Sequence, residues 1–138
     1  MISIKVSDCI STDFAKIHPN MPVADASAEL IKKTSLGGPV TDQDGKLVGW
    51  ISEQECLQVT LQVAYHNTRI ALVKDVMRED VLSVTLESDP LEIAQEMLKA
   101  KPKSYPVVDG KNKVLGVLTR RNILNMLDKN LQHLEGKK

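Results

Sequence analysis

The chain has 138 residues, enough for one compact unit or for two small halves that share a core. Apolar residues make up 42% of it and aromatic residues 3%, so we expect an aliphatic core. The formal net charge is zero, which argues against a nucleic-acid-binding protein, because such proteins depend on a basic excess for affinity. No apolar run reaches the length of about 18 residues that a membrane span needs, and the first residues lack the apolar stretch of a secretory signal. We therefore expect a cytoplasmic protein without nucleic-acid or membrane partners.

The sequence contains an internal repeat. Val6–Ile10 matches Val73–Met77, which lies 67 residues further along the chain. One single-residue gap aligns the rest of the two copies, and self-similarity at a fixed offset indicates a duplication. We assign the first repeat to residues 1–66, the second to 67–134, and residues 135–138 to a frayed tail. Further matches join Pro22 to Pro90, Ala26 to Ala94, Leu30 to Leu98, Pro39–Asp42 to Pro106–Asp109, Lys46–Gly49 to Lys113–Gly116, and Leu57 to Leu124.

Both repeats show the same succession of predicted elements, β-α-β-β-α. A short β segment is followed by a helix that begins at a proline, a residue favoured at the first helical position. Two short strands joined by turn residues come next, and a second helix closes the repeat. In the first repeat the elements are Phe14–Ile17, a helix from Pro22, Pro39–Thr41, Leu47–Ile51 and Glu53–Ala64. In the second they are Val81–Val84, a helix from Pro90 capped by Asp89, Pro106–Val108, Val114–Leu118 and Arg121–Leu134.

This order of elements predicts an α/β (α+β) fold. A repeat of about 65 residues buries too little surface to be stable alone. We therefore expect the two repeats, connected by the linker Tyr65–Leu72, to pack against each other around a pseudo-two-fold axis. Such packing doubles any cleft between them.

The start of the last predicted helix carries an electrostatic conflict. Thr119 is a suitable N-cap, and a helix start attracts anions because its N–H groups lack partners. Arg120 and Arg121 nevertheless lie in the first turn, where Asp or Glu is favoured. Two interpretations remain open: the helix start receives a phosphate-bearing ligand, or the arginines point into water or pair with carboxylates elsewhere.

Each repeat resembles the CBS domain, a regulatory unit named after cystathionine β-synthase. The resemblance rests on the β-α-β-β-α order and on a Pro-Val-hydrophobic-Asp strand that is followed by Gly-h-h-[Ser/Thr]-x-x-[Asp], where h is hydrophobic. It extends from about Val6 to Leu127. The resemblance implies a tandem pair that binds adenine nucleotides or adenosyl ligands in clefts between the repeats and dimerises into a flat disc.

The resemblance also implies two sets of site residues. In the family the Ser or Thr after the strand contacts phosphate, the Asp three residues later holds ribose hydroxyls, and residues near the Pro-Val strand and the first β segment frame adenine. The nucleotide-binding set in the second repeat is Leu82, Lys103, Ser104, Tyr105, Pro106, Val117, Thr119, Arg120, Arg121 and Asn122. A second, weaker set in the first repeat is Ala15, Leu36, Gly37, Pro39, Trp50, Ser52, Gln54 and Glu55.

Two positions depart from the family pattern, because its ribose-binding Asp is Asn122 in one repeat and Glu55 in the other. An amide accepts a hydroxyl proton less strongly than a carboxylate does. Ser52 and Glu55 also match a capping box, in which Glu55 is structural; both interpretations of Glu55 remain open. Glu53 and Glu55 would repel a phosphate, so the second repeat is the better nucleotide site. The weaker site stays empty or accepts a nucleoside without phosphate.

The sequence shows no catalytic constellation and no metal site. His18, His66 and His133 are scattered without metal-ligand spacing, and no glycine-rich phosphate loop of the P-loop type occurs. Cys9 and Cys56 lack Cys-x-x-Cys spacing and are expected to be buried reduced thiols. We therefore predict a protein that is not an enzyme and requires no cofactor.

Two further features bear on partners. Trp50 and Tyr105 are the aromatic residues nearest the proposed clefts, and each either stacks on adenine or packs at an interface; for Trp50 we favour packing. The last helix has an apolar seam that exceeds the needs of one repeat and favours a homodimer. The seam comprises Leu124, Leu127, Leu131 and Leu134, with Leu57, Leu61 and Ala64 as its counterpart in the first repeat.

These observations predict a regulatory energy or ligand sensor. The ligand is AMP, ADP, ATP or S-adenosylmethionine; the motif does not separate these from one another or from a cyclic dinucleotide. An effector protein would receive the signal. The alternative is a constitutive dimeric interaction protein with degenerate, ligand-free clefts. An enzyme or a nucleic-acid binder is the weakest hypothesis, because there is no nucleophile–base pair and no net charge.

Overall fold

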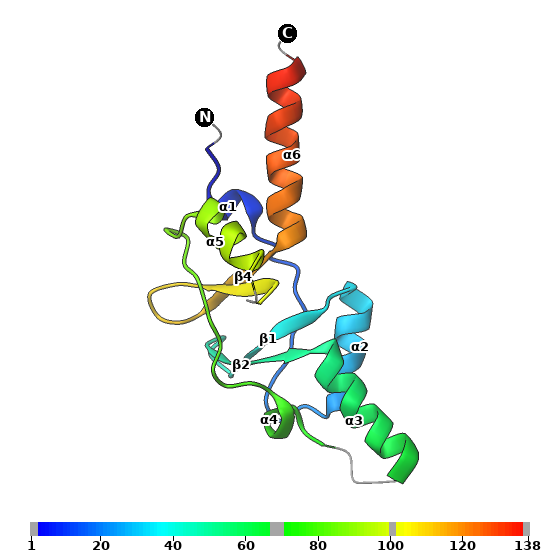
Figure 1. Ribbon diagram of the computed structural model, residues 1–138. Coiled ribbons are helices and arrows are strands. Elements are labelled where there is room, and N and C mark those ends of the chain that lie inside the picture. The colour runs from blue at the N-terminus through cyan, green and yellow to red at the C-terminus, as the bar shows by residue number, and fades with distance from the viewer. Residues whose placement is uncertain (1–2, 67–70, 100–101, 137–138) are drawn as a thin grey trace.

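The computed structural model describes residues 3–66, 71–99 and 102–136. The predicted linker Tyr65–Leu72 lies partly outside them. Within the described ranges the chain forms six helices and four strands (Figure 1). They are α1 Val6–Cys9, α2 Val23–Lys33, β1 Gly37–Thr41, β2 Leu47–Ser52, α3 Glu53–His66, α4 Val73–Val76, α5 Pro90–Met97, β3 Ser104–Val108, β4 Val114–Thr119 and α6 Arg120–Gly136.

The strands form two separate antiparallel hairpins, β1 with β2 and β3 with β4. The hairpins share a register irregularity at the same place, between Val40 and Thr41 in one and between Val107 and Val108 in the other. The two predicted β segments, Phe14–Ile17 and Val81–Val84, each contribute one parallel bridge rather than a strand, through Ile17 and Val84. The mixed helix-and-strand fold and the internal duplication are thus confirmed.

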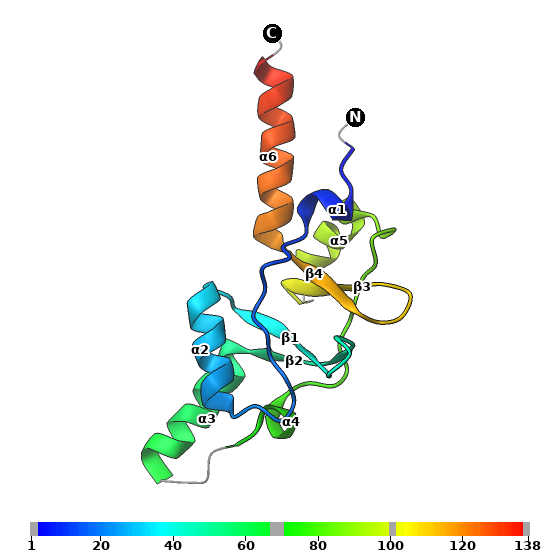
Figure 2. The ribbon, with the colours of Figure 1, turned by 180° about the vertical axis from the view of Figure 1, so that it is seen from behind.

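The predicted helix starts are close to the observed ones. Asp89 caps α5, because its side chain accepts a hydrogen bond from the Leu91 N–H at 2.9 Å, and Pro90 is the first helical residue. Pro22 instead occupies the N-cap position of α2, which begins at Val23. The last helix, α6, extends to Gly136 and projects away from the rest of the chain (Figures 1 and 2). It therefore includes the first part of the segment 135–138 for which we predicted a frayed tail.

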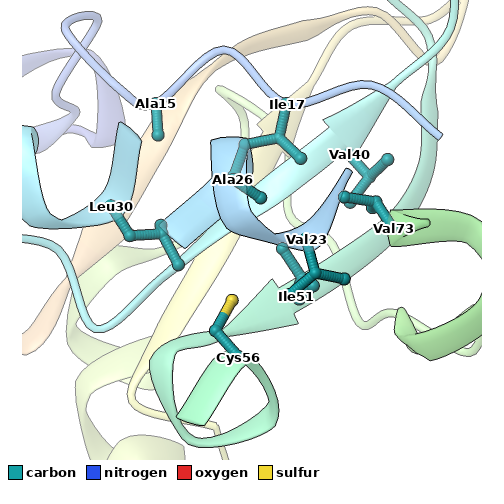
Figure 3. Close-up of a cluster of buried hydrophobic side chains, with 9 residues drawn as sticks. All are labelled: Ala15, Ile17, Val23, Ala26, Leu30, Val40, Ile51, Cys56 and Val73. Carbon is teal, nitrogen blue, oxygen red and sulfur yellow. The ribbon is translucent and has the colours of Figure 1, made fainter. Parts of the chain in front are cut away.

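The packing of the two cores does not follow the two sequence repeats. The first core lies between α2, α3 and the β1–β2 hairpin, and Figure 3 shows Val73 of α4 reaching into it. The second core lies between α5, α6 and the β3–β4 hairpin, and it includes Val6 and Cys9 of α1. Each repeat thus contributes its leading helical turn to the core of the other repeat. In Figure 1, α1 accordingly lies beside α5 and α6, whereas α4 lies below the first hairpin.

We call α1 and α4, each together with the residues that directly follow it, the exchanged segments. They cross the hairpins at two equivalent glycines. The chain that follows α4 passes over Gly49, where an added Cβ atom would lie 2.6 Å from Met77 Sδ and 2.9 Å from the Arg78 carbonyl oxygen. The chain that follows α1 passes over Gly116, where a Cβ atom would lie 2.7 Å from the Ser11 carbonyl oxygen. A side chain at either position would force the exchanged segment to shift relative to its hairpin.

The tips of the two hairpins also bind each other. The Leu47 N–H donates to the Asn112 carbonyl oxygen at 3.0 Å, and the Val114 N–H donates to the Gly45 carbonyl oxygen at 3.0 Å. The Asn112 side-chain amide adds a bond to the Leu47 carbonyl oxygen at 3.1 Å. Gly45 and Asn112 occupy equivalent places in the two turns, and both have left-handed backbones, with φ of 80° and 65°. These bonds and the exchanged segments connect the two repeats.

Candidate functional site

A cavity of about 800 Å³ lies where the two repeats meet. The first repeat contributes the loop before β1, the indole of β2 and the start of α3. The second repeat contributes the exchanged segment after α4 and the residues that lead into β3. The lining residues are Leu36, Gly37, Trp50, Ser52, Glu53, Gln54, Glu55, Arg78, Asp80, Val81, Leu82, Pro102, Lys103 and Ser104.

Trp50 forms part of the cavity wall although only 6% of its surface is exposed. An added Cβ atom at Gly37 would lie 2.7 Å from the Trp50 Nε1 atom, so the bare backbone of Gly37 makes room for the indole ring. The packing interpretation of Trp50 agrees with this burial. Stacking of the Trp50 indole on adenine stays a prediction. Trp50 is the single tryptophan of the chain, which makes its fluorescence a specific probe of this cavity.

The start of α3 has the capping box that the sequence predicts. The Ser52 N–H donates to Glu55 Oε1 at 2.9 Å, and the Ser52 hydroxyl donates to the same oxygen at 3.0 Å. The Glu55 N–H donates to Ser52 Oγ at 3.2 Å. Arg78 Nε lies 3.9 Å from Glu55 Oε1 and forms a long ion pair with it. The Glu55 carboxylate therefore occupies the hydrogen-bond donors of Ser52 at this helix start.

The charges on the cavity wall are unequal. Three acidic side chains, Glu53, Glu55 and Asp80, face two basic ones, Arg78 and Lys103. The formal charge of the lining is therefore −1. The two glutamates also lie in the first turn of α3, where they neutralise the positive end of the helix dipole.

The cavity combines residues that the sequence assigns to two different sites. From the weaker set it contains Leu36, Gly37, Trp50, Ser52, Gln54 and Glu55, and from the stronger set it contains Leu82, Lys103 and Ser104. The cause is the exchange of segments, because the chain after α4 crosses to the first hairpin and carries Arg78 to Leu82 with it. Ala15 belongs instead to the first core, and Pro39 is fully buried.

The other residues of the stronger set do not line this cavity, although Thr119 pairs with Ser104 in the second hairpin and the Arg120 N–H donates to the Lys103 carbonyl oxygen at 3.3 Å. Tyr105 and Val117 are each 6% exposed, and Pro106 is fully buried; burial raises the pKa of the Tyr105 hydroxyl. Thr119, Arg120, Arg121 and Asn122 form the junction of β4 and α6. The Asn122 N–H donates to Thr119 Oγ1 at 3.0 Å, which confirms the predicted cap.

The two arginines of α6 are not neutralised by neighbours. Within the described ranges neither Arg120 nor Arg121 forms an ion pair, and both side chains are exposed. The start of α6 therefore presents positive charge, whereas the equivalent start of α3 presents negative charge.

Sequence reasoning missed several residues of the cavity wall, namely Arg78, Asp80, Val81 and Pro102. The repeat offset contains a signal for them, because Asp13 and Asp80 are equivalent and both directly precede a predicted β segment. That signal does not indicate which hairpin the segment crosses. The crossing depends on long-range packing, which the repeat pattern leaves open.

Other kinds of site find no support among the residues that the structure describes. No three His, Cys, Asp or Glu side chains in that part of the chain come together as metal ligands. No helix there is both long enough and apolar enough to cross a membrane. Cys9 and Cys56 are buried and free, and burial raises the pKa of both thiols, so they stay protonated and unreactive near neutral pH.

A comparison with protein families decides the family of this chain. The CBS domain model matches twice, over residues 6–61 and 73–129. The chain belongs to the CBS domain family. Both matches fall within the two sequence repeats, so the chain contains a CBS domain pair.

The chain is similar to CBS proteins along most of its length. The CBS domain-containing protein MJ0729 of Methanocaldococcus jannaschii is 30% identical over 127 residues, which cover 90% of this chain and 95% of that protein. Protein MJ1004 of the same organism is 27% identical over 126 residues, but the chain spans only 58% of its length.

Solved CBS pairs have the same fold. CBSX2 in complex with AMP is 29% identical with a TM-score of 0.80, over 92% of this chain and 98% of that one. CBSX2 is a CBS-pair protein from Arabidopsis thaliana. The CBS domain pair of protein MJ0100, in complex with 5′-methylthioadenosine and S-adenosyl-L-methionine, is 25% identical with a TM-score of 0.77, over 90% of this chain and 99% of that one.

Proposed function

We propose that this CBS domain pair is a regulatory module, without catalytic activity, that binds an adenosyl ligand in the cavity between its repeats. The observation that carries the proposal is the composition of the cavity wall, which both repeats build around the exchanged segment after α4. A volume of about 800 Å³ is in the range of small-molecule sites. The AMP complex of CBSX2 and the adenosyl complexes of MJ0100 support the class of ligand.

The ligand acts through the arrangement of the two repeats. A ligand that contacts Trp50 in the first hairpin and Leu82 in the exchanged segment bridges parts of the wall that belong to different repeats. It therefore favours one relative arrangement, in proportion to the difference in its affinity for the available arrangements. An effector protein that contacts both repeats would detect this difference. AMP, ADP, ATP and S-adenosylmethionine are the candidate ligands, and no further cofactor is needed.

We also propose that the pair forms a homodimer through α3 and α6. Leu57 and Leu61 of α3 are 58% and 44% exposed, and Leu124 and Leu131 of α6 are 67% and 49% exposed. Leu57 and Leu124 are equivalent in the two repeats, so the pseudo-two-fold axis presents two similar apolar helix faces. A second copy of the chain covers both faces through a self-complementary interface. Leu134, the end of the predicted seam, lies outside the side chains that the structure describes.

Ligand titration followed by thermal unfolding tests the proposed function. A ligand at 100 to 1,000 times its dissociation constant stabilises a protein by about 2.7–4.1 kcal/mol. For a chain of this size that is an increase of several degrees in the melting temperature. The Leu82→Trp variant fills part of the cavity without changing its charge, at a side chain that is already half exposed, so it should abolish the shift without preventing folding. Absence of a shift with adenosine, AMP, ATP and S-adenosylmethionine would contradict ligand sensing.

One observation favours a second candidate, a constitutive dimeric interaction protein. Glu55 occupies the position of the ribose-binding acid, yet its Oε1 atom accepts two hydrogen bonds from Ser52. A cleft whose polar groups already form hydrogen bonds with one another has fewer free donors and acceptors for a ligand. The constitutive protein would dimerise equally with and without adenosyl compounds, and it would show no change in melting temperature with any of them.

A further inference from the structure

The two repeats begin their last helices with opposite charges. The start of α3 reads Ser52-Glu53-Gln54-Glu55, and the equivalent start of α6 reads Thr119-Arg120-Arg121-Asn122. The first has a formal charge of −2 and the second a formal charge of +2. The cavity of about 800 Å³ lies at the acidic start.

We infer that this cavity selects adenosyl ligands without a phosphate group, neutral or cationic at the 5′ position of the ribose, and rejects 5′-phosphates. The inference rests on the proposed function, since it names which class of adenosyl ligand the cavity accepts. Three features of the wall support this selectivity: the hydrogen bonds of Glu55, the surplus of acidic side chains and the position of the basic ones.

The Glu55 carboxylate already occupies the place of an anion at the helix start. A phosphate at the start of α3 would have to take the Ser52 N–H and hydroxyl from Glu55 Oε1, which now accepts both at 2.9 and 3.0 Å. The displaced carboxylate would lose these two bonds while a second anion came to lie beside it. At the start of α6, by contrast, Thr119 Oγ1 accepts from Asn122 and no carboxylate lies in the first turn.

The basic side chains of the wall do not offset this arrangement. The Arg78 side chain already forms an ion pair with Glu55, at 3.9 Å between Nε and Oε1. Lys103 is the other basic residue of the lining, and the acidic side chains Glu53 and Asp80 exceed it in number. A phosphate monoester adds a charge of about −1.5 to −2 near neutral pH. A positively charged sulfonium at the same place would be attracted by the acidic side chains. An uncharged thioether there would be neither attracted nor repelled.

Trp50 fluorescence tests the inference, because the single tryptophan lies in this wall and its equivalent in the other repeat is Val117. The titrants are 5′-methylthioadenosine, S-adenosylmethionine and AMP, which share the adenosine group. We expect the two phosphate-free compounds to change the emission with dissociation constants at least about tenfold lower than that of AMP, since like charges at close range disfavour binding.

A charge-neutral variant isolates the cause. In the Glu53→Gln/Glu55→Gln double variant the cap persists, because glutamine also serves at the last position of a capping box. The preference over AMP should fall by about tenfold or more, through tighter AMP binding. The Glu53→Gln single variant, which leaves every Glu55 bond in place, should show part of the effect. Glu92→Gln, in the first turn of α5 and outside the cavity, is the matched control and should leave the preference unchanged.

The possible results separate the two proposals. If AMP changes Trp50 emission as tightly as 5′-methylthioadenosine does, or if the double variant keeps the wild-type preference, the inference is overturned and the proposed function stands. If calorimetry detects AMP but Trp50 emission does not respond to it, the nucleotide binds away from this cavity, which supports the inference. If no adenosyl compound binds by either method, the proposed function itself fails.

Discussion

Trp50 and Arg78 exchange two backbone hydrogen bonds of 2.9 Å each, although they belong to different repeats. Ser11 and Val117, their equivalents, exchange two bonds of the same length. The pseudo-two-fold relation between the repeats therefore holds for the places where the exchanged segments cross the hairpins, as well as for the helices and strands. It also places the segment that begins at Arg78 in the wall of the cavity, so that the fold connects the proposed ligand site to the packing of both repeats.

The crossing predicts a severe effect of small substitutions at two glycines. In Gly49→Ala the new methyl group would lie 2.6 Å from Met77 Sδ, and in Gly116→Ala it would lie 2.7 Å from the Ser11 carbonyl oxygen. Because the second contact is with backbone, it cannot be relieved by a side-chain rotation. We expect each variant to lose about 1–3 kcal/mol of unfolding free energy, measured by urea denaturation. Gly110→Ala, where a Cβ atom meets nothing within 4 Å, should change stability by less than about 0.5 kcal/mol.

The capping box at α3 predicts different effects for two substitutions of one residue. Glu55→Ala removes the acceptor of the Ser52 N–H and hydroxyl, and we expect it to lower the unfolding free energy by about 0.5–1.5 kcal/mol. Glu55→Gln keeps an oxygen acceptor at the same place and should lose less. Thermal unfolding of both variants measures the difference. Equal melting temperatures for the alanine and glutamine variants would contradict a structural role of Glu55.

The turn of the second hairpin predicts an acid-sensitive contribution to stability. Asp109 Oδ1 accepts the N–H groups of Lys113 and Lys111 at 2.9 and 2.8 Å, and these bonds lower the pKa of the carboxyl group below its usual value. A carboxyl group whose pKa is lower in the folded state stabilises the folded state at pH values above the pKa of the unfolded chain, which is about 3.9 for Asp. This contribution is lost as the pH falls through the folded pKa.

Comparison with Asp109→Asn measures that contribution. The amide oxygen keeps an acceptor in the turn but does not titrate, so the fall in urea midpoint between about pH 5 and pH 3 should be shallower than in the wild type. The ion pair with Lys33 also lowers the pKa of Asp13, so the contribution of Asp13 to the stability of the protein is lost over the same acid range. Asp13 is present in both the wild type and the variant. A wild type and a variant with parallel pH profiles would exclude the turn as a source of acid sensitivity.

The left-handed backbone of Asn112 predicts an order of stability among its variants. Asn112 has φ of 65°, and its side chain donates to the Leu47 carbonyl oxygen in the other hairpin. Asn112→Gly loses only the side-chain bond, whereas Asn112→Ala also places a Cβ atom in a conformation that costs about 1–2 kcal/mol. We expect the melting temperature to fall in the order wild type, glycine, alanine. An alanine variant as stable as the glycine variant would show that the turn relaxes without strain.

The sequence predicted features that depend on residues close together in the chain. The Ser52–Glu55 box, the Asp89 cap and the Thr119 cap are each set by three-residue or two-residue spacings, and all three are observed. The exchange of α1 and α4 was not predictable in the same way, because both cores consist mainly of aliphatic side chains and Val6 suits either. The composition of the cavity follows from that exchange. For this reason the sequence identified many of its residues while dividing them between two sites.

The proposed homodimer is tested by adding charge to the two exposed helix faces. The Leu57→Asp/Leu124→Asp variant places a carboxylate in each apolar face, where a second copy would have to bury it. We expect sedimentation of the wild type at twice the 15.3 kDa of the chain and sedimentation of the variant as a monomer. Ile31→Asp, at a 77% exposed position on α2, is the matched control and should stay dimeric. A monomeric wild type, or a double variant that remains dimeric, would rule out α3 and α6 as the interface.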